Sequence, residues 1–180
     1  LSKPSLKQVA LWPVKLVVRF AILAGLLMYI RYRLFDITML LNGALGGLVA
    51  VTAGPDLYDI YTPILIGAVG GTLVVFAVPL FDRLRLDDPV GALSVHLVNG
   101  IWGTIAVGLF AADTEGGVVG LFYGGGVSQL VGQIVGIVAV GVFTVAASAV
   151  FWGVTKAIVG MRVTTDEEYL GLDMSVLSET

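Results

Sequence analysis

Apolar residues run through this chain in five long stretches, which short polar segments separate. The stretches cover residues 13–30, 37–53, 63–81, 89–110 and 127–159. An α-helix needs about 20 apolar residues to cross the hydrocarbon core of a bilayer. The pattern therefore predicts an all-α fold, a polytopic membrane helix bundle with about five transmembrane helices. The last stretch is longer than one bilayer needs, so we expect its helix to tilt or to project from the membrane.

The first stretch differs from the others because it carries charge. Lys15 and Arg19 lie one turn apart on one face, and Arg31, Tyr32 and Arg33 follow its end. Basic side chains near a membrane boundary can extend their charged ends to the headgroups. Two interpretations stay open: a spanning or tilted helix with one basic face, or an amphipathic helix on an anionic membrane surface. We expect a retained helix rather than a signal peptide, because no small-residue cleavage site is evident.

The composition agrees with a membrane bundle. Hydrophobic residues make up 57% of the chain and charged residues 13%, whereas a soluble domain carries about a quarter charged residues. The 24 glycines suit helices that pack closely in lipid. The predicted helix-packing positions are Gly46, Gly47, Gly67, Gly71 and Gly103.

Several classes of site are excluded by the residues present. The chain has no cysteine, so it has no disulfide and no thiolate metal site. The glycine run 124–126 is not a phosphate-binding loop, because no lysine with serine or threonine follows it. No nucleophile–base set and no cluster of metal ligands is evident in the sequence. We therefore expect no enzymatic activity, no cofactor, no metal and no nucleic-acid partner.

The segment 87–110, DDPVGALSVHLVNGIWGTIAVGLF, contains the only histidine of the chain. Asp87 or Asp88 can accept hydrogen bonds from the free amides at a helix start, and Pro89 fits the first helical position. A helix from that point places His96 roughly 10 Å along its axis, inside the hydrocarbon core. Ionisable groups inside membranes are costly and tend to mark transport paths. The alternative is a packed, hydrogen-bonded histidine that faces a neighbouring helix.

Small and polar residues accompany this histidine. Asn99, Gly100 and Gly103 follow it at three, four and seven positions, so one face carries an imidazole, an amide and two bare backbone positions. Asn99 can hydrogen-bond either the histidine or a neighbouring helix. Gln129 and Gln133, one turn apart in the last stretch, can line a polar seam or join two helices by hydrogen bonds.

Four motifs in order resemble the C-terminal half of the ammonium transporter (Amt/Mep/Rh) family, over roughly residues 36–174. They are DITMLLNGALGGLVAVTAG at 36–54, the histidine segment at 87–110, GGGVSQLVGQIVG at 124–136, and GMRV with EEYLGLD within 160–173. The resemblance implies half of an eleven-helix fold that is built from two inverted five-helix repeats and assembles as a trimer. The resemblance also implies that each subunit contains a narrow, mostly apolar pore with two facing histidines.

The resemblance also implies roles for individual residues. His96 matches the second histidine of the pore, and Asp88 matches the aspartate that caps its helix, with Asp87 beside it. The transport-pore residues implied are His96, Ala92, Asn99 and Gly100. Gly171, Leu172 and Asp173 match the tail that contacts neighbouring subunits and the PII regulator; a tail that is merely solvated is the alternative.

The sequence departs from the family in three ways. The first pore histidine, the aromatic gate and the external cation site belong to the family's other half, which is not in this chain. Leu97 stands where the family usually has glycine. Residues 1–35 do not resemble the preceding helix of the family. We therefore expect three parts: a basic N-terminal segment with a first transmembrane helix at 1–35, a transporter-like half at 36–160, and an acidic tail at 161–180.

The charges between the stretches predict an orientation in the membrane. If each helix crosses once, the basic residues near positions 31–33, 83–85 and 156–162 fall on one side, and the loops 54–62 and 112–117 contain acidic residues and no basic ones. The positive-inside rule then places the C-terminal tail in the cytoplasm. The chain is thus expected to be a multi-pass protein of the cytoplasmic membrane.

Two hypotheses of function follow. In the first, the chain transports ammonium or ammonia and supplies the His96 half of the path, together with a missing N-terminal half from another chain or from further sequence. In the second, it is a non-conducting structural subunit of a larger membrane complex.

Overall fold

The computed structural model describes residues 20, 22–33, 36–59, 61–113 and 117–171. An N-terminal helix covers Ile22–Tyr32. The remaining elements are the helices α2 (Ile37–Val51), α3 (Thr62–Arg83), the π-helix η1 (Leu93–Leu97), α4 (Val98–Phe110), the strands β1 (Ala112–Asp113) and β2 (Val118–Val119), the 3₁₀-helix η2 (Leu121–Tyr123), and the helices α5 (Ser128–Ile158) and α6 (Thr165–Leu170). Apart from one short antiparallel strand pair, the described elements are helical, as the sequence predicts.

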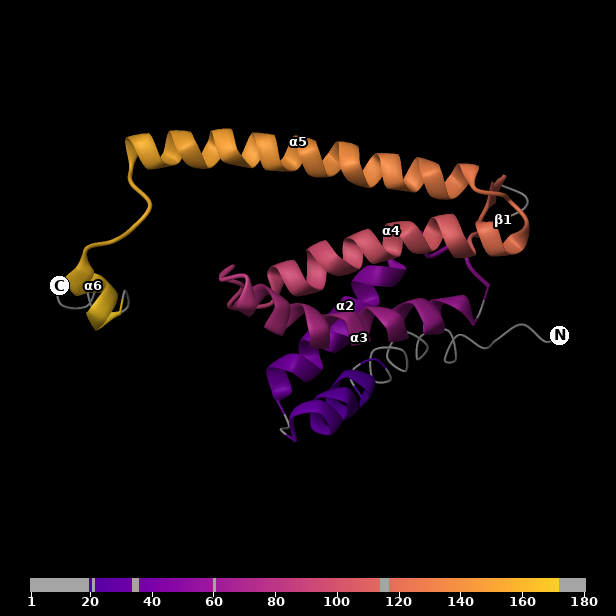
Figure 1. The fold of residues 1–180 in the computed structure, drawn as a ribbon, viewed down its shortest axis with the longest axis horizontal. Coiled ribbons are helices and arrows are strands. Elements are labelled where there is room, and N and C mark those ends of the chain that lie inside the picture. Colours follow the sequence, from indigo (N-terminus) through magenta and orange to yellow (C-terminus); the bar gives the residue numbers. More distant parts are fainter. Residues whose placement is uncertain (1–19, 21, 34–35, 60, 114–116, 172–180) are drawn as a thin grey trace, which may run out of the picture. The chain divides into compact units, whose positions relative to one another are not determined.

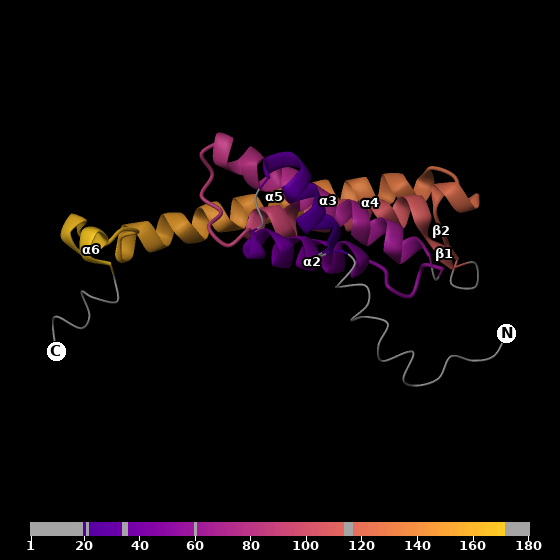
Figure 2. The same cartoon turned by 90° about the horizontal axis from the view of Figure 1, so that it is seen from below.

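The chain divides into two compact units, and the boundary falls inside α5. The first unit covers Leu1–Ile137 and contains α2, α3, η1 and α4, which pack against one another. Figures 1 and 2 show α2, α3 and α4 side by side from two directions. The second unit, Val138–Thr180, contains the end of α5 and the short helix α6.

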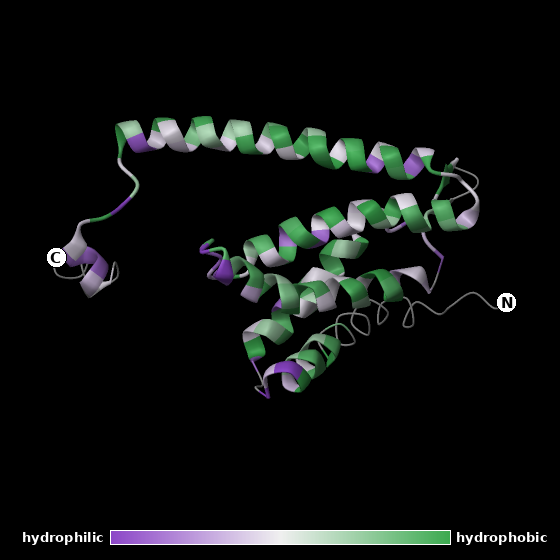
Figure 3. Ribbon diagram, in the orientation of Figure 1, coloured by the Kyte–Doolittle hydropathy of each residue, from purple (hydrophilic) through white to green (hydrophobic). Residues whose placement is uncertain are grey.

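Among the residues that the structure describes, three helical segments are long and apolar enough to cross a membrane: Thr62–Arg83, Leu93–Phe110 and Ser128–Ile158. Figure 3 shows hydrophobic residues along most of their length. Helix α2 is equally apolar but has 15 residues, about 22 Å at 1.5 Å per residue. The polytopic membrane helix bundle expected from the sequence is therefore confirmed.

Glycines bring α2 and α3 together backbone to backbone. A Cβ atom built on Gly47 lies 2.9 Å from the carbonyl oxygen of Gly67, and one built on Gly71 lies 3.0 Å from that of Gly43. No side chain fits between the helices at these points. Close backbone approach of this kind is how small residues stabilise helix pairs in lipid, where hydrophobic exclusion contributes little.

The N-terminal helix packs onto the same glycines. Phe20, Ala24 and Met28, at intervals of four residues, are all buried. The ring of Phe20 lies against Gly47 and Gly67, at positions that a glycine Cβ would occupy. This buried stripe favours a helix packed into the bundle over one lying on the membrane surface. The basic residues Lys15 and Arg19 lie outside the described residues.

Candidate functional site

The helix that carries the histidine starts later than the sequence predicts. Pro89 is not its first residue: Pro89 and Val90 form a turn in which the Gly91 amide donates to the carbonyl oxygen of Asp88 at 3.0 Å. Gly91 has φ +78°, which favours glycine because other residues meet a steric penalty there. The Asn42 side chain of α2 donates to the Val90 carbonyl at 3.4 Å and so ties this turn to the bundle.

Asp88 supplies the hydrogen bonds at the helix start. Its carboxylate accepts from the Leu93 amide at 2.9 Å, from the Ser94 amide at 3.0 Å and from the Ser94 hydroxyl at 2.9 Å. Burial by itself raises the pKa of Asp88, but these hydrogen bonds outweigh it and hold the pKa below its ordinary value. Asp87 makes no such bond among the described residues, so Asp88 is the capping residue of the pair.

His96 lies within the π-turn η1 and is exposed, as is Ala92 one turn before it. Leu97 and Ile101 on the same side are 49% and 38% exposed. A Cβ atom built on Gly100 would have nothing within 4 Å. No described side chain hydrogen-bonds the imidazole. The ring therefore lies on an open, mostly apolar face, which we call the His96 face and define by Ala92, His96, Leu97, Gly100 and Ile101.

Asn99 does not lie on the His96 face. Its side chain is fully buried and lies between Gly46 of α2 and Gly70 of α3, whose Cβ atoms would approach its amide to 2.7 and 2.8 Å. The Nδ2 group donates to the Ser94 carbonyl at 3.3 Å. The structure thus separates two residues that the sequence places on one face, and it makes Asn99 an interhelical contact rather than a partner of the imidazole.

Gly103 also faces into the bundle. A Cβ atom there would collide with the backbone of Ala50 in α2. Close by, the indole Nε1 of Trp102 donates to the carbonyl oxygen of Ile66 in α3 at 3.0 Å. These contacts fix the inner side of α4, so the opposite side of its first turns remains the uncovered one.

A polar cluster at the other end of the helices has no signal in the sequence. Asp59 accepts from the amides of Tyr61 and Thr62 at 2.9 and 2.7 Å and from the hydroxyl of Tyr123 at 2.7 Å. These bonds hold the pKa of Asp59 well below its ordinary value. Burial raises the pKa of the neighbouring Tyr58 to about 12. The cluster joins the loop before α3 to η2, two segments far apart in the sequence.

The first turns of α5 belong to the first unit and contact α4. Gln129, Leu130 and Gln133 are partly buried, and a Cβ atom on Gly108 of α4 would lie 2.6 Å from the Cα of Leu130. Neither glutamine makes a side-chain hydrogen bond to a described residue. Trp152, further along α5, is 60% exposed.

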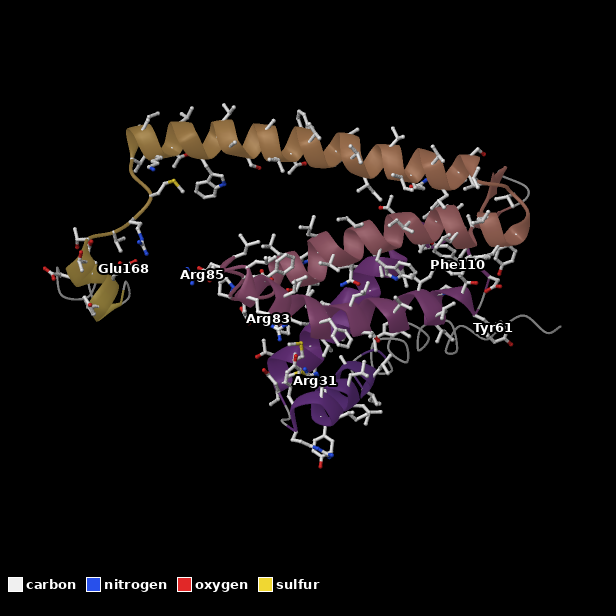
Figure 4. The ribbon with its side chains drawn as sticks, viewed as in Figure 1. Arg31, Tyr61, Arg83, Arg85, Phe110 and Glu168 are labelled. Carbon is white, nitrogen blue, oxygen red and sulfur yellow. The ribbon has the colours of Figure 1, made fainter. Side chains whose placement is uncertain are left out.

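Basic residues gather at one end of the first unit. Figure 4 shows Arg31, Arg83 and Arg85 at one end of the helices, with Tyr61 and Phe110 at the other. The guanidinium of Arg31 lies over the ring of Tyr32, 5.1 Å from its centroid. Tyrosine is enriched where helices leave a membrane, and arginine is enriched in the cytoplasmic loops that follow.

The tail begins with a short capped helix. In α6, the Thr164 hydroxyl accepts from the Glu167 amide while the Glu167 carboxylate accepts from the Thr164 amide, which forms a capping box. Arg162 and Glu168 form an ion pair at 3.0 Å. Gly171 ends the helix with φ +83°. Leu172 and Asp173 lie outside the described residues.

Within the part of the chain that the structure describes, no group of three or more His, Asp or Glu side chains could hold a metal ion. The chemical features of the site are therefore one accessible imidazole, an apolar surround, and a rigidly anchored helix start.

Comparison with known proteins identifies relatives of one kind. A family model described as the Ammonium Transporter Family matches residues 18–180. Ammonium transporter Amt1 of Archaeoglobus fulgidus is 31% identical over 136 residues, which are 76% of this chain and 34% of that protein. An ammonium transporter of Bacillus subtilis is 37% identical over 77% of this chain and 35% of its own length.

Solved structures agree with these matches. A protein described as a Sensor Amt Protein superposes with a TM-score of 0.80 at 25% identity, over 96% of this chain and 43% of that one. Mep2 of Candida albicans gives a TM-score of 0.76 at 26% identity, over 86% of this chain and 36% of its own. The chain spans about a third of the length of the curated relatives named above. The family match starts at residue 18 and so reaches into the segment 1–35 that the motifs left out.

Proposed function

From its membership of the ammonium transporter family, we propose that this chain takes part in moving ammonium or ammonia across a membrane. It contributes the half of the conduction path that carries His96. The facing half comes from another chain or from further sequence of the same protein. The observation that carries this proposal is the exposure of His96 on an open apolar face, in a segment whose other side is packed into the bundle.

The chemistry of the substrate explains why such a face is useful. An ammonium ion loses strong hydration when it enters hydrocarbon, whereas neutral ammonia does not carry that penalty. A dry passage can therefore transmit ammonia if the ion releases its proton near the entrance. An imidazole is suited to accept, donate or relay that proton, because its unperturbed pKa lies near neutrality.

The shape of the His96 face supports the same role. Ala92 and Gly100 lie one turn before and after the imidazole and leave room beside it, and Leu97 and Ile101 make its surroundings apolar. A second apolar surface placed against this face would enclose a narrow passage with the imidazole in its wall. Leu97 narrows that passage more than a glycine would.

Transport is tested with the purified chain and all its native partners in proteoliposomes. We expect an ammonium-dependent current or internal pH change with the native complex. His96→Ala should reduce it at least tenfold without changing assembly, because the proton-handling group is lost while no bond to a described residue is broken. Val142→Ala, which changes an exposed residue of α5, is the matched control. Unchanged flux in His96→Ala contradicts the relay role, and absence of flux in the native complex contradicts transport.

A second candidate is a non-conducting structural subunit. The observation in its favour is that no described residue of the first unit covers the His96 face, so this unit does not enclose a passage by itself. Transport by the chain reconstituted alone would contradict our proposal that a facing half is required. A complex that assembles through the His96 face yet gives no flux would favour the structural role.

We further propose that the C-terminal tail is cytoplasmic and that the complete assembly is a trimer in which the tail contacts neighbouring subunits or a PII regulator. The common position of Arg31, Arg83 and Arg85 at one end of the helices supports this orientation. Protease added to sealed inside-out vesicles should cut the tail, and protease added to right-side-out vesicles should not. Cross-linking from a cysteine at position 171 distinguishes contact with a neighbouring subunit from contact with the regulator.

A further inference from the structure

The histidine lies in an irregular turn of a helix that is otherwise α-helical. Leu93–Leu97 form a π-turn, and the Val98 amide donates to the carbonyl oxygen of Leu93, five residues back. A π-turn accommodates one residue more than an α-helical turn, and it is a rare arrangement that needs support from its surroundings. Two side chains, Asp88 and Asn99, hydrogen-bond this turn, and both contact Ser94.

Asp88 holds the beginning of the turn. It accepts hydrogen bonds from both amides and the hydroxyl described above, so the backbone of Leu93 and Ser94 is fixed relative to the preceding loop. Ser94 is fully buried. This anchor alone fixes where the helix starts but not how many residues its first turn contains.

Asn99 follows the turn in the sequence and contacts it from inside the bundle. Its Nδ2 group donates to the carbonyl oxygen of Ser94, and the amide lies so close to Gly46 and Gly70 that a Cβ atom on either glycine would collide with it. Its Oδ1 atom is buried without a hydrogen-bond partner among the described residues. Burying the Oδ1 atom without a partner costs free energy. The hydrogen bond from Nδ2 to Ser94 is the polar contact of this side chain that offsets that cost.

The spacing of buried residues shows what the contact achieves. Ser94 and Asn99 are five residues apart and both are fully buried. Five residues of α-helix turn the chain through about 500°, which leaves two such side chains roughly 140° apart around the axis. The wider winding of the π-turn brings them to the same side. Val95 is then buried as well, and His96 is left on the open face.

We propose that Asn99 is a positioning residue that keeps Leu93–Leu97 in the π form and thereby holds the His96 imidazole on the open face. The consequence for transport rests on the proposed function, but the structural effect on the imidazole does not. Asn99 acts through the backbone of Ser94 and has no contact with the path itself.

The test uses the single histidine of the chain as a spectroscopic probe. The full chain, in the assembly in which it purifies, is labelled with ¹³C,¹⁵N-histidine and placed in lipid nanodiscs with a histidine-free affinity tag. The imidazole then gives one Cε1 resonance. Asn99→Leu keeps a side chain of similar size but lacks the Nδ2 hydrogen-bond donor. Asn99→Ala also lacks the donor and leaves space in which the neighbouring side chains can repack. Trp102→Phe is the matched control. It removes another side-chain hydrogen bond of the same helix, the one that Trp102 donates to Ile66 of α3, and leaves the π-turn untouched.

In both Asn99 variants we expect the Cε1 resonance to move by more than its linewidth, since the chemical shift of an imidazole depends on its surroundings. Trp102→Phe should leave the resonance unchanged. An unchanged resonance in the Asn99 variants, or an equal change in Trp102→Phe, overturns the inference. If the resonance moves in the Asn99 variants while His96→Ala has normal flux, the positioning role stands and the proposed function fails.

A measurement on the unaltered chain decides the question if neither Asn99 variant folds. With labelled asparagine and serine, rotational-echo NMR measures the separation of the Asn99 side-chain nitrogen and the Ser94 carbonyl carbon. A short separation, consistent with the N···O contact of 3.3 Å, is the expected result. A side chain turned away from Ser94 overturns the inference.

Discussion

Replacing Asp88 with alanine is expected to destabilise the start of the histidine helix strongly. The carboxylate accepts two amide hydrogen bonds and one hydroxyl hydrogen bond, and Ser94 is fully buried, so water cannot replace the lost acceptor there. Loss of an N-cap side chain costs about 0.5–2 kcal/mol, and a hydrogen bond to a charged group contributes about 1.5–3 kcal/mol. We expect Asp88→Ala to lower the free energy of unfolding by about 2–4 kcal/mol and Asp88→Asn by about half as much, since asparagine keeps one acceptor oxygen.

The effect should depend on pH with a definite sign. Because the pKa of Asp88 is lower in the folded chain than in the unfolded one, its hydrogen bonds stabilise the folded state fully above the unfolded pKa, about 3.9. That stability is lost as the pH falls through the folded value. The difference in stability between the native chain and Asp88→Asn should therefore be largest near neutrality and shrink below about pH 4.

The assay is unfolding in detergent micelles, followed by circular dichroism, at pH 7, 5 and 3. Asp87→Ala is the control, because Asp87 makes no hydrogen bond to the helix start, and it should change the stability by less than about 0.5 kcal/mol. If Asp88→Ala is as stable as Asp87→Ala, or if the difference for Asp88→Asn is the same at every pH, the capping account is refuted.

Other contacts lead to further expectations. Gly103→Ala should lower the free energy of unfolding by about 1–3 kcal/mol, since its Cβ meets backbone that cannot move aside, whereas Gly132→Ala in α5 should be neutral; equal stability of the two variants argues against the close crossing. Tyr123→Phe should raise the pKa of Asp59 towards its ordinary value, because a hydrogen bond to the carboxylate is lost, and carboxyl NMR titration measures the change; no change would exclude that bond in solution. Thr164→Ala should fray α6 and speed amide exchange in its first turn several-fold, with no effect in α4; equal protection in both forms would show that the capping box is dispensable.

The hydrophobic pattern predicts which segments are helices, but it does not predict which faces they bury. Apolar side chains serve equally well inside the bundle and against lipid, so nothing in the composition of the histidine segment separates the exposed Leu97 from the buried Val95. The positions of the helices and the capping role of one of the paired aspartates could be predicted because each depends on residues close together in the sequence.

Features that depend on the third dimension could not be predicted in this way. The π-turn shifts the register between Ser94 and Asn99, and a helical wheel drawn at 3.6 residues per turn therefore places the asparagine beside the histidine. The contact that ties the turn at Pro89 to the bundle joins Asn42 to Val90, and the cluster at Asp59 depends on Tyr123, 64 residues further along the chain. No local pattern contains these pairings.

The crossing of α2 and α3 limits how these two helices can move relative to each other. Where two main chains touch without intervening side chains, one helix cannot slide past the other by a turn, because bulkier neighbours would have to pass through the contact. We therefore expect the two helices to move together as one rigid pair.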